Sequence, residues 1–224
     1  MTNPIQIAID GPAAAGKSTI AKIVAEQLGY IYIDTGAMYR AITLKAINEG
    51  INMASNEEAG ELLLRTQIDL KPSDNGQLVF MDGAEVTEAI RTQQVTKAVS
   101  EMSAHALVRE RMVELQRQLA KSRGVVMDGR DIGTDVLPNA ALKVFMSATV
   151  EERARRRFED NKARGIDTPL AELQEEIAAR DKMDSEREVS PLKQAADAIY
   201  IDTTKLTIRE AAQEILALAK ERMA

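Results

Sequence analysis

Short apolar runs alternate along the chain with longer segments whose apolar residues recur with helical spacing. The apolar runs cover residues 5–10, 30–34, 125–128, 142–146 and 198–202. Runs of this length without polar alternation are typical of strands buried on both faces. Because helical segments separate most of them, we predict an α/β fold: a doubly wound, five-stranded parallel sheet flanked by helices.

The helical segments begin and end at recognisable signals. We expect helices over residues 17–28, 38–49, 55–66, 92–103, 107–122, 150–164, 169–187 and 207–223. Residues 34–36 are predicted to form a turn, and Gly165 is predicted to stop the helix before it. These boundaries leave residues 68–86 without a predicted helix and without any of the five apolar runs.

Residues 68–86 interrupt the alternation of strands and helices. The stretch holds β-prone pieces at 68–71, 77–81 and 85–86, separated by residues 73–76 and by Asp82-Gly83. Asn-Gly and Asp-Gly pairs favour tight hairpins. We therefore predict a small antiparallel sheet inserted into the α/β core.

The first apolar run leads into a glycine-bounded loop that matches the phosphate-binding P-loop pattern, with strand and helix on either side. Glycines let the backbone approach an anion, and the N–H groups of the loop and of the new helix point toward it. The lysine supplies a cation for the β- and γ-phosphates, and we expect it to face solvent in an empty site. The predicted ATP-binding residues are Gly11, Pro12, Ala13, Ala14, Ala15, Gly16, Lys17, Ser18 and Thr19.

Composition excludes several classes of protein. A net charge of −6 argues against general nucleic-acid binding, and the absence of cysteine excludes disulfides and thiolate metal sites. The single histidine, His105, is interpreted as a helix-junction residue, which makes an acyl-transfer triad improbable. Residues 1–4 show no signal-peptide pattern and no apolar run is long enough to span a bilayer, so we expect a cytoplasmic protein that contacts no membrane.

Aspartates end four of the predicted strands: Asp10, Asp34, Asp128 and Asp202. Ligands of open α/β sheets bind beyond the carboxyl ends of the strands. In P-loop proteins a carboxylate at such a position lies near Mg²⁺, so Asp128 is the candidate metal carboxylate, with a turn-capping role as the alternative.

Arginines gather on two predicted helices. Arg153, Arg156 and Arg157 share a face, and mobile cations of this kind stabilise charge in phosphoryl transfer. A solvated basic helix is the alternative, and it is the preferred interpretation for Arg155 and Lys162. On the next helix, the spacing of Arg180, Asp184 and Arg187 by itself favours an intrahelical ion-pair ladder.

The sequence lacks the guanine-reading element of GTPases, because residues 161–164 contain Asn-Lys without the following aspartate. The remaining blocks resemble those of bacterial cytidylate kinases over residues 5–215. The more specific blocks are Asp-Thr-Gly-Ala-Met-Tyr-Arg at 34–40 and Asp-Gly-Arg-Asp-Ile-Gly-Thr at 128–134. Further matching residues lie at 9–12, 15–18, 88–92, 152–157 and 180–187.

The resemblance implies an architecture and a reaction. The chain would be one P-loop kinase unit over residues 1–224, with a monophosphate-binding subdomain at about 37–105 that contains the insertion at 68–86, and an arginine-bearing lid at about 150–168. It would transfer the γ-phosphoryl of ATP in line to CMP or dCMP with Mg²⁺, giving ADP and CDP or dCDP, in pyrimidine nucleotide salvage and metabolism. We expect a monomer whose partners are these nucleotides.

The resemblance also carries roles onto matching positions. The cytosine would contact Thr35, Ser100, Arg109, Asp131 and Arg187. Arg180 and Asp184 would hold the sugar, and Tyr39, Arg40 and Arg130 the acceptor phosphate. Catalytic roles would fall to Lys17, Arg130, Arg153, Arg156 and Arg157. The metal would be held by Asp128 and by Ser18 or Thr19, partly through water.

Two other functions remain open from the sequence. One is a kinase for a different small anionic acceptor, which the insertion and the aspartates near the expected base site disfavour. The other is a regulator that binds nucleotides without catalysis, which would not need a cationic lid. Initial rates with several monophosphates separate the three hypotheses.

Overall fold

The computed structural model describes residues 4–73, 76–121 and 124–223. Within them, the core is a parallel sheet of five strands in the order β2-β6-β1-β7-β8. The predicted doubly wound α/β fold is therefore confirmed. The strands are β1 (Gln6–Asp10), β2 (Ile31–Asp34), β6 (Val125–Gly129), β7 (Leu142–Ser147) and β8 (Ile199–Asp202).

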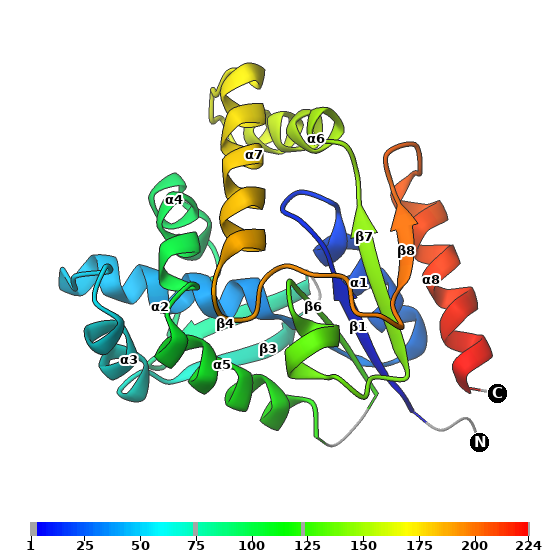
Figure 1. Cartoon of the computed structure of the whole chain (residues 1–224), viewed down its shortest axis with the longest axis horizontal. Coiled ribbons are helices and arrows are strands. Elements are labelled where there is room, and N and C mark those ends of the chain that lie inside the picture. The colour runs from blue at the N-terminus through cyan, green and yellow to red at the C-terminus, as the bar shows by residue number, and fades with distance from the viewer. Residues whose placement is uncertain (1–3, 74–75, 122–123, 224) are drawn as a thin grey trace.

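Apolar side chains of the sheet point alternately to two separate cores. Val126 packs with the helices α1 (Lys17–Leu28) and α8 (Ile208–Met223) on one face. Its neighbour Met127 packs on the other face with residues of four helices: α2 (Thr35–Glu49), α3 (Asn56–Leu64), α4 (Gln93–Met102) and α5 (Ala106–Leu119). Both faces are covered, which explains the nearly continuous apolar runs of the strands (Figure 1). Burial on both faces fixes the register, so the strand ends meet at one edge of the sheet.

The ends of the helices agree with prediction within three residues, and the start of α2 is the informative difference. The helix α2 (Thr35–Glu49) begins three residues before the expected start at residue 38, so the predicted turn at 34–36 is wrong. Asp34 is the N-cap, and its Oδ1 accepts from the backbone N–H of Ala37 at 2.9 Å. The aspartate that was interpreted as a turn residue instead satisfies a free N–H of the first helical turn.

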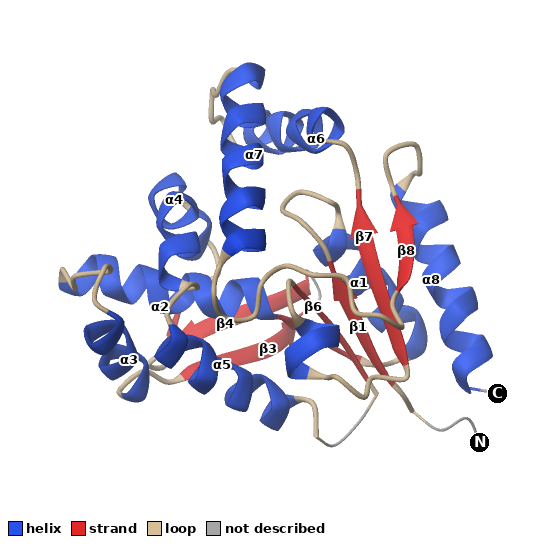
Figure 2. Cartoon of the chain, in the orientation of Figure 1, coloured by secondary structure: helices blue, strands red, loops and turns tan. Residues whose placement is uncertain are grey.

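The insertion forms the predicted antiparallel sheet (Figure 2), with strands β3 (Ile68–Ser73), β4 (Gly76–Met81) and β5 (Ala84–Glu85). Asp82 and Gly83 both have positive φ, +51° and +82°, as a two-residue hairpin requires. Asp74 and Asn75, which were part of the other predicted turn, lie outside the described residues.

The remaining helices are α3 (Asn56–Leu64), α4 (Gln93–Met102), α5 (Ala106–Leu119), α6 (Val150–Ala163) and α7 (Leu170–Glu186), with a 3-10 turn at Ala89–Arg91 and a π-helical turn at Ile132–Val136. Figure 1 shows α6 and α7 projecting beyond the edge of the sheet where the strands end. They pack on each other through Ala154, Leu173 and Ile177. His105 is the N-cap of α5 and bonds the carbonyl of Met53, in keeping with its interpretation as a junction residue. Of the helices in the described ranges, none is both long and apolar enough to span a membrane.

Candidate active site

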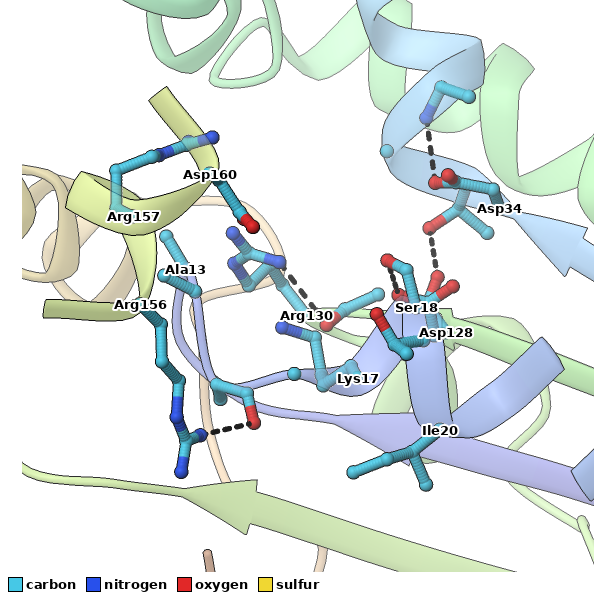
Figure 3. A pocket seen from close by; sticks show the side chains of 18 of the residues that line it. Ala13, Lys17, Ser18, Ile20, Asp34, Asp128, Arg130, Arg156, Arg157 and Asp160 are labelled. Carbon is cyan, nitrogen blue, oxygen red and sulfur yellow. Dashed lines mark hydrogen bonds between the residues drawn. The ribbon is translucent and has the colours of Figure 1, made fainter. Parts of the chain in front are cut away.

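A cavity of about 790 Å³ opens at the carboxyl edge of the sheet. The P-loop lies at one side of it and α6 and α7 at another, and residues of α2, α4, α5, β6 and α8 contribute further to the lining. Figure 3 shows Lys17, Ser18 and Asp128 close together, with Arg130 beside Lys17 and Arg157 on the α6 side. The site is therefore assembled from segments that are far apart in the sequence.

Backbone geometry explains the glycines of the P-loop. Gly11 has a φ of +147°, and a Cβ there would lie 1.9 Å from the carbonyl oxygen of Met146, so no side chain fits. Gly16 has a φ of +88° and is the N-cap of α1 without any side-chain cap. The first N–H groups of α1 are thus left free to bind an anion, as at other helix N-termini.

Lys17 differs from its prediction. It lines the cavity, but its side chain is buried with 5% exposure, and Nζ donates to the carbonyl oxygen of Pro12 at 2.7 Å. Burial and the neighbouring Arg130 lower its pKa. The lysine is thus folded against its own loop, and a bound anion would favour its charged form.

The Asp128 carboxylate is held by two hydroxyl groups. Ser18 Oγ donates to Oδ2 at 2.9 Å, and the Tyr32 hydroxyl donates to Oδ1 at 2.7 Å. Burial and then Asp34 raise the pKa of Asp128. The structure therefore brings Ser18 to the carboxylate, while Thr19 is exposed on the cavity lining.

The other strand-end aspartates have separate surroundings. Asp34 lines the cavity as the cap of α2. Asp10 is buried and accepts the backbone N–H groups of Ile132 and Gly133. Asp202 is exposed and accepts from Thr204. Sheet topology aligns the strand ends, but it does not decide which side chains reach the ligand.

Next to Lys17 of the P-loop, an ion-pair cluster lines the cavity. Arg130 Nε donates to Asp184 Oδ2 at 2.9 Å, and Arg180 Nε lies 4.0 Å from the same oxygen. Burial and then Arg130 lower the pKa of Arg180 to about 9. The helix face that carries Arg180 and Asp184 therefore points into the cavity. Arg187 lies just after the end of α7, so it is not part of the intrahelical ion-pair ladder that the spacing favoured.

A second buried cluster surrounds Asp131. Arg109, which is 1% exposed, donates to Oδ2, and Arg187 Nη2 lies 3.7 Å from Oδ1. The Arg109 guanidinium also stacks at 5.4 Å on the ring of Tyr39, whose hydroxyl is buried without a partner among the described groups. At this wall of the cavity, the carboxylate offers hydrogen-bond acceptors to a ligand and the two guanidinium groups offer donors.

The remaining predicted ligand contacts are placed unevenly. Arg40 lines the cavity and bonds Ile90 O and Thr96 Oγ1, at 3.2 and 2.8 Å. Thr35 also lines it, with Oγ1 donating to the carbonyl of Asp128 at 2.7 Å. Ser100 does not line this cavity; it lines a neighbouring one of about 320 Å³ between α4, α6 and α7.

Several residues of the lining were not singled out from the sequence, among them the polar residues Arg91, Ser103 and Arg164. Arg91 ends the 3-10 turn, and its buried Nε has no partner among the described groups. It falls within the block at 88–92 that resembled the family, so that block was the available signal. Ser103 follows α4 by one residue and faces the site where Ser100 was expected.

The three arginines of α6 do not act alike. Arg153 is buried outside the cavity lining, where it donates to Ala148 O, Ala13 O and Asp181. The expectation that it faces the phosphates is therefore not met. Its guanidinium joins the P-loop to α6 and α7, because it lies on α6 and donates both to the P-loop carbonyl of Ala13 and to Asp181 of α7.

Arg156 and Arg157 do line the cavity. Arg156 bonds Glu152 Oε1 at 2.9 Å and the carbonyl of Thr203 at 2.6 Å. No hydrogen bond or ion pair is found for Arg157 within the described part of the chain, and burial lowers its pKa. Arg157 is thus the α6 cation that is available to a phosphate. Arg155 pairs with Glu152 at the surface, as a solvated helix face predicts.

A P-loop on a five-stranded parallel sheet, facing a cavity lined by basic side chains, defines the class of P-loop kinases. A gluconokinase from Sinorhizobium meliloti shares the fold, with a TM-score of 0.51 at 17% identity over 99% of this chain and 95% of that one. The family model for cytidylate kinase matches residues 7–221, and the chain belongs to that family.

Individual relatives agree. The chain is 64% identical over 223 residues to the cytidylate kinase of Lysinibacillus sphaericus, covering 100% of both chains. It is 57% identical over 222 residues to the cytidylate kinase of Bacillus subtilis, covering 99% of both.

Proposed function

We propose that this protein transfers the γ-phosphoryl group of ATP to CMP or dCMP, giving ADP and CDP or dCDP. The observation that carries the proposal is the Asp131 carboxylate held by Arg109 and Arg187 in a cavity whose other wall is the P-loop. The P-loop wall suits a triphosphate, and the wall formed by Asp131, Arg109 and Arg187 suits a base that carries both hydrogen-bond donors and acceptors.

Hydrogen-bond chemistry favours cytosine at this wall. Cytosine offers its N4 amine as a donor and N3 and O2 as acceptors, which complement the Asp131 carboxylate and the Arg109 guanidinium. Uracil reverses the signs at positions 3 and 4, which would set O4 against a carboxylate. Each buried polar group left unpaired costs about 1–3 kcal/mol.

The basic residues between the two walls would hold the acceptor phosphate. Arg40, Arg130, Arg180 and Arg91 line this region, and Arg130 and Arg180 already share Asp184 as their counter-ion. An oxygen of the CMP phosphate attacks the γ-phosphorus, and the bond from that phosphorus to the β-phosphate oxygen breaks, releasing ADP. The acceptor is already an anion, so positioning and charge stabilisation by Lys17 and the arginines do most of the work.

The donor set at Asp128 fits Mg²⁺. It combines one carboxylate with the Ser18 hydroxyl, and no cluster of three or more His, Cys, Asp or Glu side chains suited to a metal occurs among the described residues. Mg²⁺ is commonly held by one or two carboxylates together with waters and substrate phosphates. Bound there, the ion would neutralise charge on the β- and γ-phosphates. Ser18 is the proposed hydroxyl ligand, since its Oγ donates to Asp128, whereas no hydrogen bond joins Thr19 to Asp128 among the described residues.

Closure over the substrates gives a separate prediction. Residues 150–168 and 68–86 should gain protection from amide hydrogen exchange when CMP and a non-hydrolysable ATP analogue bind, because phosphoryl transfer must exclude water. Residues 215–223, the C-terminal part of α8, pack on α1 and do not line the cavity, so they serve as the internal control, with no change expected. Unchanged exchange in both segments would remove the case for a lid.

An initial-rate assay of ADP release with CMP, dCMP, UMP, AMP and GMP tests the proposed function. CMP and dCMP should be used best, because the base contacts do not depend on the 2′-hydroxyl. Activity with none of the five would favour another acceptor or a non-catalytic role.

We further propose that the protein acts in the cytoplasm and is a monomer. Its net charge of −6 disfavours binding to nucleic acid.

A further inference from the structure

Asp10 is a buried carboxylate that the proposed chemistry does not use. It ends β1 directly before Gly11, is 4% exposed, and is not among the residues that line either cavity. Both of its oxygens are engaged: Oδ1 accepts the N–H of Ile132 at 2.8 Å, and Oδ2 accepts the N–H of Gly133 at 2.7 Å. It therefore joins the P-loop strand to a segment more than a hundred residues later.

The two N–H groups belong to the start of the π-helical turn at Ile132–Val136, where backbone donors lack partners within the helix. Asp131 occupies the N-cap position of this turn, yet its side chain makes no capping hydrogen bond. Asp34 shows the usual arrangement, because its own carboxylate caps the helix that follows it. At Asp131, a carboxylate from another strand caps the turn.

Capping by Asp10 instead of Asp131 has a consequence for the site. Because Asp10 accepts from the free N–H groups of the turn, the Asp131 carboxylate can point away from this turn toward Arg109 and Arg187. We propose that Asp10 is a positioning residue for base selection: it caps the turn at residues 132–136 in place of Asp131 and so holds the Asp131 carboxylate at the base-binding wall. The inference rests on the proposed function.

The substitution Asp10→Asn tests this role with little change in size. An amide offers one oxygen and an NH₂ group, so one of the two backbone N–H groups would face another donor. The expected result is a KM for CMP raised roughly tenfold and a preference for CMP over UMP reduced by a similar factor, because small misplacements of binding groups carry large kinetic penalties. The KM for ATP should stay within about twofold, which a general loss of structure would not allow.

Asp202→Asn is the matched control, since Asp202 also ends a strand but is exposed, and Thr204 is the one partner of its side chain within the described part of the chain. It should leave all three quantities unchanged. Asp10→Ser, with a single small acceptor, is a second variant with the same expectation as Asp10→Asn. A variant that keeps the parental KM for CMP and the parental base preference overturns the proposal, and so does failure of both variants to fold, which would assign Asp10 to the fold as a whole. If the parent protein itself does not prefer CMP, the proposed function fails instead.

Discussion

Lys17→Met is expected to lower the rate of phosphoryl transfer by a factor on the order of 10³ or more, because it removes a cation that stabilises the transferred group. The Lys17 ammonium is the one basic group contributed by the P-loop, and it lies against the loop backbone at Pro12 O. The measurement is kcat with saturating ATP and CMP. Near-parental turnover would contradict the role assigned to Lys17.

The same variant should remain folded. Burial and Arg130 lower the pKa of Lys17, so its charged form is disfavoured in the folded protein, and methionine avoids that cost. Loss of the hydrogen bond to Pro12 O lowers the free energy of unfolding by about 1 kcal/mol, which offsets this gain. A melting temperature within roughly 4 °C of the parent is therefore expected. Lys162→Met, at an exposed position of α6, is the control and should change neither rate nor melting temperature.

Asp131→Asn is expected to reduce the ratio of kcat/KM for CMP to that for UMP by about a hundredfold. The change introduces one unfavourable pairing with CMP and removes one with UMP, and each is worth about 1–3 kcal/mol. The new amide can still accept from Arg109 through its oxygen, which turns its NH₂ group toward the base. That NH₂ group opposes the N4 amine of cytosine and suits O4 of uracil. The variant thus loses activity with CMP and gains activity with UMP.

The control for this prediction is Asp135→Asn, four residues along the same segment. The Asp135 side chain accepts from Thr134 and does not line the main cavity, so its amide should leave the base preference unchanged. An unchanged preference in Asp131→Asn would show that another group reads position 4 of the base.

Sequence patterns were most reliable where one local cause decides the structure. The strand ending at Asp10, the P-loop and the helix α1 follow from apolar runs and glycine spacing, and their boundaries agree within one residue. The hairpin at Asp82-Gly83 likewise follows from turn chemistry within a few residues. The start of α2 was missed because Asp34 has two compatible local roles, turn residue and N-cap, and its hydrogen bond to Ala37 selects the second.

The side-chain directions in the site were harder to foresee. Helical spacing put Arg153 on a face with Arg156 and Arg157, but only the packing of α6 against the P-loop and α7 decides that Arg153 is buried and saturated with acceptors. Lys17 was expected in solvent because the motif carries no information about neighbouring walls. Asp10 and Asp131 illustrate the same limit. The partners of Asp10 lie more than a hundred residues further along the chain. The partners of Asp131 are Arg109 on α5 and Arg187 at the end of α7.

The preference of the parent protein for CMP over UMP is the most direct test, because it probes the assignment of the Asp131 wall to a base. The measurement is kcat/KM for each monophosphate at the same saturating ATP and Mg²⁺. We expect CMP to be favoured at least about tenfold, equivalent to about 1.4 kcal/mol, with water relieving part of the mismatch for uracil. Equal use of CMP and UMP would contradict the placement of the base-binding wall at Asp131, Arg109 and Arg187.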